Sequence, residues 1–285
     1  MRDIRTNRSE MGRIQSALSS GKSVRVPSDG PVEFQRSRII EENIRKEKQY
    51  QNNISSGLRQ GRMAQEALEE TVDRLIEIKG KLVQASTGTS NSQLRDTMAR
   101  DLEGIRDSVI NTLNVSSGSR YLFGGTNSSV KPFEKDPAQL GGVANNSAGN
   151  NPSVLVGDGV TLDFSISATE LRDTDAGDLF EIIGNMIIAL DADDQEALNQ
   201  SLTSIESALE HVTKKTSQVA TNINRMELMF EQYEAAQISQ QAEISNLVDT
   251  DFAQAFSDLQ RNQIAYESAL AVHSTMFSNS LLDFL

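Results

Sequence analysis

Apolar residues recur at heptad spacing near the amino end of the chain and predict a short amphipathic helix. Its narrow apolar edge consists of Ile4, Met11, Ile14 and Leu18. Gly21 follows directly, and glycine commonly occupies the position just after a helix. We therefore expect the first helix to stop at Gly21.

The stretch "RVPSDGP" then predicts a break in the helical pattern. Its prolines lack backbone N–H donors, and Ser28 and Asp29 are typical caps before a helix that restarts near Glu33. We expect the chain to bend or hinge here. The residues of this break are Gly21, Pro27, Ser28, Asp29 and Pro31.

Two further helical patterns follow the break. The first of them ends in "ASTGTSNS", and its apolar positions are Ile40, Ile44, Ile54, Leu58, Leu68, Val72, Leu75 and Leu82. The other extends from about Leu94 to Leu113 after a short polar loop. Because short loops join antiparallel neighbours, the two patterns predict a helical hairpin.

The pattern changes from helical to β-like between about residues 119 and 178. Glycine and asparagine interrupt "QLGGVANNSAGNNPS", whereas "VLVGDGVTLDFSISA" alternates strictly. Val160, Leu162, Phe164 and Ile166 point one way in this alternation, and Gly-Asp-Gly before them suits a hairpin turn. These features predict a small β-rich domain inserted between helices.

The longest periodic signal follows the helical stretch "LFEIIGNMIIAL". From Leu198 to Leu247, apolar residues advance in steps of four and three and predict one helix of about 50 residues. The letters "VDTD" interrupt this phase. The expected fold is mainly α, elongated and multi-domain, with a small β-rich insertion.

The carboxyl-terminal segment restarts the helical pattern with bulky side chains. Its seam contains Phe252, Phe256, Leu259, Gln263, Tyr266, Leu270, His273 and Phe277, and the ending "SLLDFL" adds Leu281, Leu282 and Leu285. An isolated helix cannot cover its own apolar edge, and the amino-terminal helix offers few matching residues. We therefore expect partner subunits to cover both terminal helices.

These patterns divide the chain into five expected segments. They are an amino-terminal assembly helix with the break (1–32), the first half of a helical rod (33–118), a β-rich domain (119–178), the second half of the rod (179–248) and a carboxyl-terminal assembly helix (249–285).

Composition narrows the functional classes. The 285 residues carry a formal net charge of −13, which disfavours nucleic acid and anionic membrane surfaces as partners. The chain has no cysteine, so disulfides and thiolate metal sites are excluded. The amino end lacks the apolar core of a cleaved secretory signal, and no apolar run is long enough to span a bilayer, so membrane insertion is not expected.

Three groups of residues invite a chemical reading. The letters Gly-Lys-Ser at 21–23 end a P-loop, but Ser16 stands where its first glycine is required, and a helix precedes it instead of a strand. His211 and His273 each lack a second ligand at helical spacing. The acidic stretches "RDTDAGD" and "DADDQE" lack the pattern of a calcium loop and read as helix caps. We expect no catalytic, cofactor-binding or metal site.

Several motifs resemble the flagellin superfamily over nearly the whole chain, and within it the hook–filament junction proteins. They are "LSSGKSVRVPSDGP", "SGSRYLFGGT" followed by Pro132-Phe133, and the stretch from "DTDFAQAF" to the end. Gly30 replaces the second acid of the family's P-S-D-D-P motif, and the helix before Gly21 is shorter than the family's usual amino-terminal segment. The ending "SLLDFL" favours a junction protein over a filament subunit.

The resemblance implies a non-enzymatic structural adaptor on the extracellular flagellum. Its subunits would form a ring through paired terminal helices, with the β-rich domain facing outward, another hook-associated protein on the hook side and flagellin on the filament side. It also implies export without cleavage and an export chaperone on the carboxyl-terminal helix. Two alternatives stay open: a short flagellin that forms the filament itself, and a secreted helical effector or adhesin.

Overall fold

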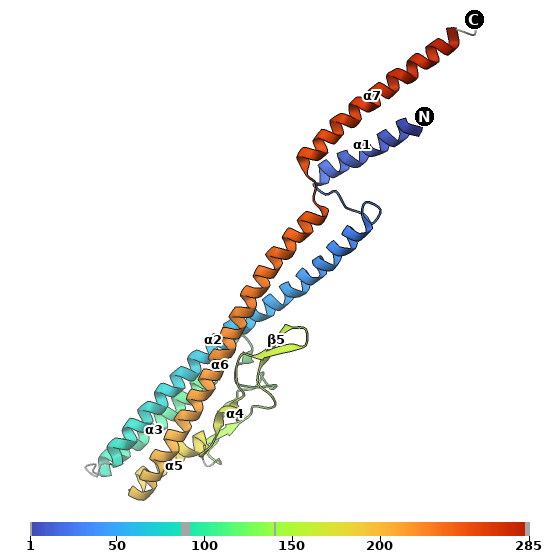
Figure 1. Ribbon diagram of the computed structural model, residues 1–285. Helices are drawn as coiled ribbons and strands as arrows, with labels where there is room; N and C mark the ends of the chain where they lie inside the picture. Colours follow the sequence, from blue (N-terminus) through green and yellow to red (C-terminus); the bar gives the residue numbers. More distant parts are fainter. Residues whose placement is uncertain (1, 87–91, 140, 283–285) are drawn as a thin grey trace. The chain divides into compact units, whose positions relative to one another are not determined.

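The structure, a computed structural model, describes residues 2–86, 92–139 and 141–282, with side chains described for 5–86, 93–139 and 141–272. Within these residues the chain is mainly helical, as its periodicity predicts (Figure 1). The helices are α1 (Arg2–Ser20), α2 (Pro31–Ser86), α3 (Ser92–Leu113), α4 (Ala168–Arg172), α5 (Leu179–Asp191), α6 (Gln195–Val248) and α7 (Phe252–Leu282).

The long helices begin and end close to the predicted positions. Helix α2 starts at Pro31, two residues before Glu33, because proline suits the first turn, where its missing N–H has no partner to lose. Helix α6 is continuous over 54 residues, in agreement with the unbroken heptad pattern. Helices α2 and α3 form the predicted pair and are joined by the Lys81–Asp101 ion pair.

The strands form four separate two-stranded antiparallel ribbons. They are β1 (Ser116–Ser117) with β2 (Arg120–Tyr121), β3 (Phe133–Lys135) with β4 (Val143–Asn145), β5 (Ser153–Gly157) with β6 (Val160–Asp163), and β7 (Asp173–Thr174) with β8 (Gly177–Asp178). The predicted hairpin at 157–159 is present, with Gly159 at a φ of 68°.

The predicted alternation from Val160 to Ile166 is only partly correct. Leu162, Phe164 and Ile166 are buried, but Val160 is 47% exposed. Strand β6 also ends at Asp163, so the last two apolar residues lie beyond it. The register of the ribbon shifts between Leu155 and Gly157, opposite Val160, so the alternation is not regular beside the turn.

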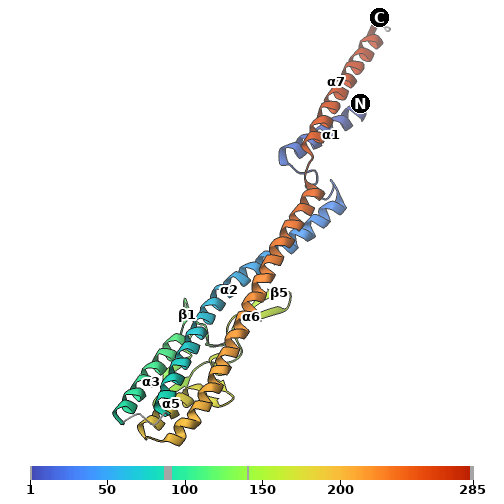
Figure 2. The ribbon, with the colours of Figure 1, turned by 60° about the vertical axis from the view of Figure 1, so that its left-hand side comes forward.

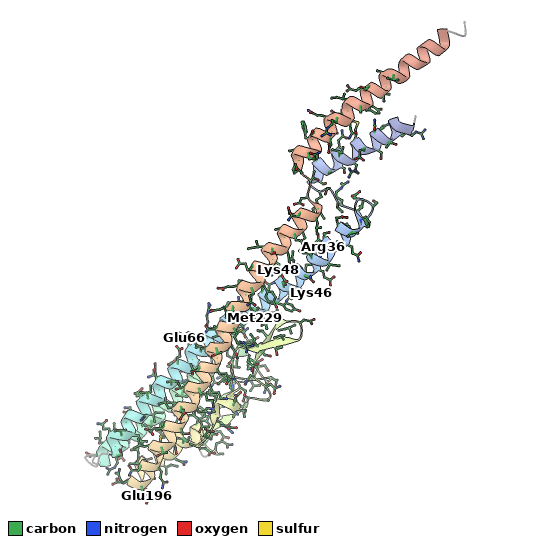
Figure 3. The ribbon with its side chains drawn as sticks, viewed as in Figure 1. Arg36, Lys46, Lys48, Glu66, Glu196 and Met229 are labelled. Atoms are coloured by element: carbon green, nitrogen blue, oxygen red, sulfur yellow. The ribbon has the colours of Figure 1, made fainter. Side chains whose placement is uncertain are left out.

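The chain divides into two compact units, residues 1–48 with 234–285 and residues 49–233. In the second unit, the β-rich segment shares one apolar core with α2, α3, α5 and α6. Gly57 of α2 permits this contact, because a Cβ there would lie 2.9 Å from Val154 Cγ2. Met229 of α6 packs against the same core (Figure 3). The five-segment division of the chain stays a prediction.

The motif "YLFGGT" anchors the β-rich segment to this core. Leu122 and Phe123 are almost fully buried, and Phe133 stacks edge-on against Phe180 of α5. Gly125 has a φ of 63°, and a Cβ there would lie 2.3 Å from the carbonyl oxygen of Ala148. Only glycine therefore fits this position.

The two acidic stretches cap helices, as predicted. Asp178 accepts hydrogen bonds from the N–H groups of the first turn of α5. Asp194 does the same for α6, from Glu196 at 3.1 Å and Ala197 at 3.0 Å. Its neighbour Asp193 pairs with Arg95 of α3.

The first unit has a smaller apolar cluster of its own. Ile40 of α2 packs with Ile244 and Val248 of α6, and Arg36 pairs with Glu243 beside them (Figure 3). The terminal helices α1 and α7 lie side by side in this unit, as the views of Figures 1 and 2 show.

Candidate assembly interface at the terminal helices

The amino-terminal helix packs against α7, and its predicted apolar edge is the buried one. Ile14 is buried at 7% exposure, and Met11 and Leu18 are half-buried. Ile4 belongs to the same predicted edge, but its side chain lies outside the described residues. The heptad pattern therefore located the inner face of α1 correctly over the described residues.

Two segments from opposite ends of the chain join where α1 ends. Gly21 terminates α1 at a φ of 72°, and Lys22 and Asp249 form an antiparallel bridge. The Ser23 N–H donates to the carbonyl oxygen of Val248 at 2.8 Å, and the Thr250 N–H donates to that of Gly21 at 2.9 Å. The Gly-Lys-Ser letters thus form a backbone joint between chain ends.

The break after this joint is a turn built around Asp29. Pro27, Ser28 and Asp29 form the turn, and the carboxylate of Asp29 accepts hydrogen bonds from the N–H groups of Arg25 at 3.0 Å and Val26 at 3.2 Å. These hydrogen bonds lower the pKa of Asp29.

The predicted capping role of Ser28 and Asp29 is wrong. The Asp29 side chain bonds backward into the turn, and α2 begins with Pro31, so that Gly30 occupies the N-cap position. The carbonyl oxygen of Gly30 accepts the first helical hydrogen bond, from Phe34 at 2.9 Å.

The side chain of Asp251 caps the start of helix α7. The Asp251 carboxylate accepts hydrogen bonds from the N–H groups of Ala253 at 2.9 Å and Gln254 at 3.1 Å. This cap fixes the start of α7 directly after the backbone joint.

The predicted single seam of α7 divides into two faces. Leu259 and Tyr266 are half-buried, whereas Phe252 and Phe256 are each 56% exposed and Leu270 is 43% exposed. At 100° per residue, the exposed side chains lie along one flank of the half-buried ones. We call Phe252, Phe256 and Leu270 the open strip. The apolar sector of α7 is therefore wider than one neighbouring helix can cover.

Sequence reasoning missed the small residues on the half-buried face of α7. Ala255 and Ala269 are half-buried there, although neither belongs to the bulky seam. Their spacing of 14 residues equals two heptads, and this spacing indicates that both lie on the same face of the helix. The predicted interface residues Phe277, Leu281, Leu282 and Leu285, with His273 of the same seam, have side chains outside the described residues.

The candidate chemical sites of the sequence have other roles in the structure. His211 Nε2 hydrogen-bonds the carbonyl oxygen of Glu170 at 2.9 Å. Over the side chains that are described, no three potential metal ligands gather at one point. No described helix contains a stretch both apolar and long enough to cross a bilayer.

Comparison with known proteins supplies the family. Residues 1–128 match the model of the bacterial flagellin N-terminal helical region, and residues 202–285 match that of the bacterial flagellin C-terminal helical region. The chain is 23% identical over 300 residues to flagellar hook-associated protein 3 of Escherichia coli (strain K12), which covers 99% of this chain and 95% of that protein.

Solved structures share the fold. FlgL of Bacillus cereus superposes with a TM-score of 0.61 at 19% identity, covering 73% of this chain and 99% of that one. The flagellar junction protein FlgL of Legionella pneumophila superposes with a TM-score of 0.62 at 14% identity, covering 75% and 99%. The resemblance read from the motifs is confirmed: this chain belongs to the bacterial flagellin superfamily.

Proposed function

We propose that this protein is a structural adaptor of the bacterial flagellum that forms the junction between hook and filament. The observation that carries the proposal is the open strip of α7, which α1 leaves uncovered beside the joint of the two chain ends. An apolar strip of this kind needs a further helix to cover it. The relatives named hook-associated protein 3 and junction protein support the place in the flagellum.

In this proposal, copies of the chain form a ring through their terminal helices. The open strip of one copy packs against terminal helices of the next, and the break from Gly21 to Pro31 adjusts the angle between lattices of different subunits. Another hook-associated protein contacts the ring on the hook side, and flagellin contacts it on the filament side. The adaptor has no enzymatic role.

The same strip gives a reason for an export chaperone. Phe252, Phe256 and Leu270 expose apolar surface before assembly, and such surface favours aggregation. We propose that a chaperone covers α7 in the cytoplasm and that the protein leaves the cell without cleavage to reach the extracellular flagellum.

A gene deletion with complementation tests the junction role. Deletion should abolish motility and release filament subunits into the medium, and the intact gene should restore attached filaments. The double variant Phe252→Gln, Phe256→Gln should not restore them, because it removes the open strip. The matched variant Leu228→Gln changes a 59% exposed leucine on α6 and should restore filaments fully.

A deletion strain that keeps its filaments would contradict the junction role. If deletion sheds filaments but the phenylalanine variant restores them, the junction role stands and the open strip is not its contact.

The second candidate is a filament subunit, which the match to both flagellin helical regions favours. A seeding experiment separates the two. Purified protein added to filament fragments should stop after a limited addition if it is a junction subunit. Continuous extension of the fragments would make it a flagellin instead.

A further inference from the structure

A polar cavity lies in the larger unit, outside the terminal helices. Its volume is about 660 Å³, which is within the range of cavities that bind small organic ligands. Residues of α2, of β2 with the loop after it, and of β5 with the loop before it line most of the cavity. Side chains from three separate segments therefore set its chemistry, and they meet only in the folded unit.

Hydrogen bonds within the chain hold the walls of the cavity in place. Asn53 Nδ2 of α2 donates to the carbonyl oxygen of Leu155 in β5 at 3.0 Å. The N–H and the hydroxyl of Thr126 both donate to the carbonyl oxygen of Ala148, at 2.7 and 2.8 Å. Because these contacts exist without a ligand, a molecule that enters the cavity does not have to order its walls.

The charge of the lining differs from that of the chain. None of the described residues that line the cavity is acidic, although the chain has 40 acidic residues against 27 basic ones. Arg120 is the basic residue among them and is exposed, and no ion pair or hydrogen bond occupies its guanidinium within the described part of the chain. A guanidinium binds a carboxylate through two parallel hydrogen bonds, so Arg120 suits a ligand with one negative charge at that end.

The neutral part of the lining combines hydrogen-bonding groups with apolar surface. The amide oxygen of Gln60, the hydroxyl of Tyr121 and the side chain of Asn150 have no hydrogen-bond partner among the described residues. Leu122 and Phe164 add buried apolar surface to the same lining. Sugar hydroxyls both donate and accept hydrogen bonds, and the C–H faces of sugar rings pack on apolar and aromatic side chains.

We propose that this cavity binds a short saccharide that carries a carboxylate. Arg120 binds the carboxylate, while Gln60, Tyr121 and Asn150 bind ring hydroxyls. A phosphate monoester fits less well, because its charge is close to −2 at neutral pH and the lining offers one guanidinium. The inference is independent of the proposed function, because no residue that lines the cavity belongs to a terminal helix.

Isothermal titration calorimetry of the purified full-length protein tests the proposal. The probes are cellobiouronic acid, 3′-sialyllactose and trigalacturonic acid, and cellobiose is the neutral counterpart of the first. We expect at least one acidic probe to bind at one site per chain, about tenfold or more tighter than cellobiose. Inorganic phosphate should not compete with it. Absence of binding by all three acidic probes, or equal binding of cellobiose, would overturn the proposal.

Three variants locate the bound saccharide. Arg120→Gln should weaken binding of the acidic probe about tenfold or more, because it removes the charged partner of the carboxylate. Tyr121→Phe removes one hydroxyl and should weaken binding less. Arg225→Gln changes an exposed arginine of α6 that does not line the cavity, and it should leave binding unchanged. Equal binding by the Arg120 and Arg225 variants would place the saccharide elsewhere and contradict the assignment. Circular dichroism establishes that each variant is folded.

Discussion

Two glycines near the amino end differ in the backbone that they adopt. Gly21 has a φ of 72°, whereas Gly12 lies within α1 and a Cβ there would meet nothing within 4 Å. We expect Gly21→Ala to destabilise the joint by about 1–2 kcal/mol, because a left-handed backbone strains any Cβ.

Gly12→Ala is the matched control and should stabilise α1 by about 0.5–1 kcal/mol, since alanine loses less backbone entropy in a helix. Amide hydrogen exchange of α1 should therefore become faster in the first variant and slower in the second. Equal exchange in the two variants would remove the role assigned to the Gly21 backbone.

Asp29 gives a pH-dependent prediction at the same scale. Its hydrogen bonds from Arg25 and Val26 lower its pKa below 3.8, the ordinary value for aspartate. A depressed pKa means that the contacts are present above the unfolded pKa and are lost as the pH falls through the folded one.

The amide resonances of Arg25 and Val26 should therefore shift together, with a midpoint below 3.8. In Asp29→Asn this titration should disappear. A midpoint above that value would contradict the turn geometry.

At the scale of elements, heptad periodicity located the long helices but not their surroundings. Spacing fixes which side of a helix is apolar, so the inner edge of α1 and the extent of α6 could be predicted. It does not fix how many neighbours cover that side, and the seam of α7 therefore proved to be two faces.

The two faces of α1 and α7 predict different stability effects. Phe256→Gln on the open strip should change the free energy of unfolding by about 0.5 kcal/mol or less, because its side chain is already largely in water. Ile14→Ala in the buried edge should cost about 2–5 kcal/mol. Urea unfolding of the monomer, monitored with a probe in the first unit, compares the two variants. Equal costs would mean that the strip is covered within one chain.

The β-rich segment offers a test of its attachment to the core. Gly125→Ala should destabilise the larger unit by about 3 kcal/mol, because its Cβ would collide with Ala148 in a strained backbone. Gly118 also has a positive φ, of 64°, but its Cβ would meet nothing within 4 Å, so Gly118→Ala should cost only about 1 kcal/mol. Thermal unfolding distinguishes the two, and similar melting temperatures would contradict the close backbone approach.

At the scale of the whole molecule, the two compact units differ in how much they bury. The larger unit holds nearly all of the apolar core, while the first relies on a small cluster and on α1 against α7. In the monomer we expect weak amide protection in α1 and α7 and strong protection in α6 between 195 and 233. Protection of the terminal helices should rise on assembly. Uniform protection in the free monomer would mean that partners are not needed to order the ends.

The joint of Lys22 with Asp249 also sets the order in which the chain can fold. Its partners are separated by most of the length of the chain, so the first unit has a high contact order. Closing this contact therefore has a cost in loop-closure entropy. A chain that emerges amino end first must present α1 without its partner until the last residues follow. We therefore expect the first unit to be the last to fold, after the whole chain has been released.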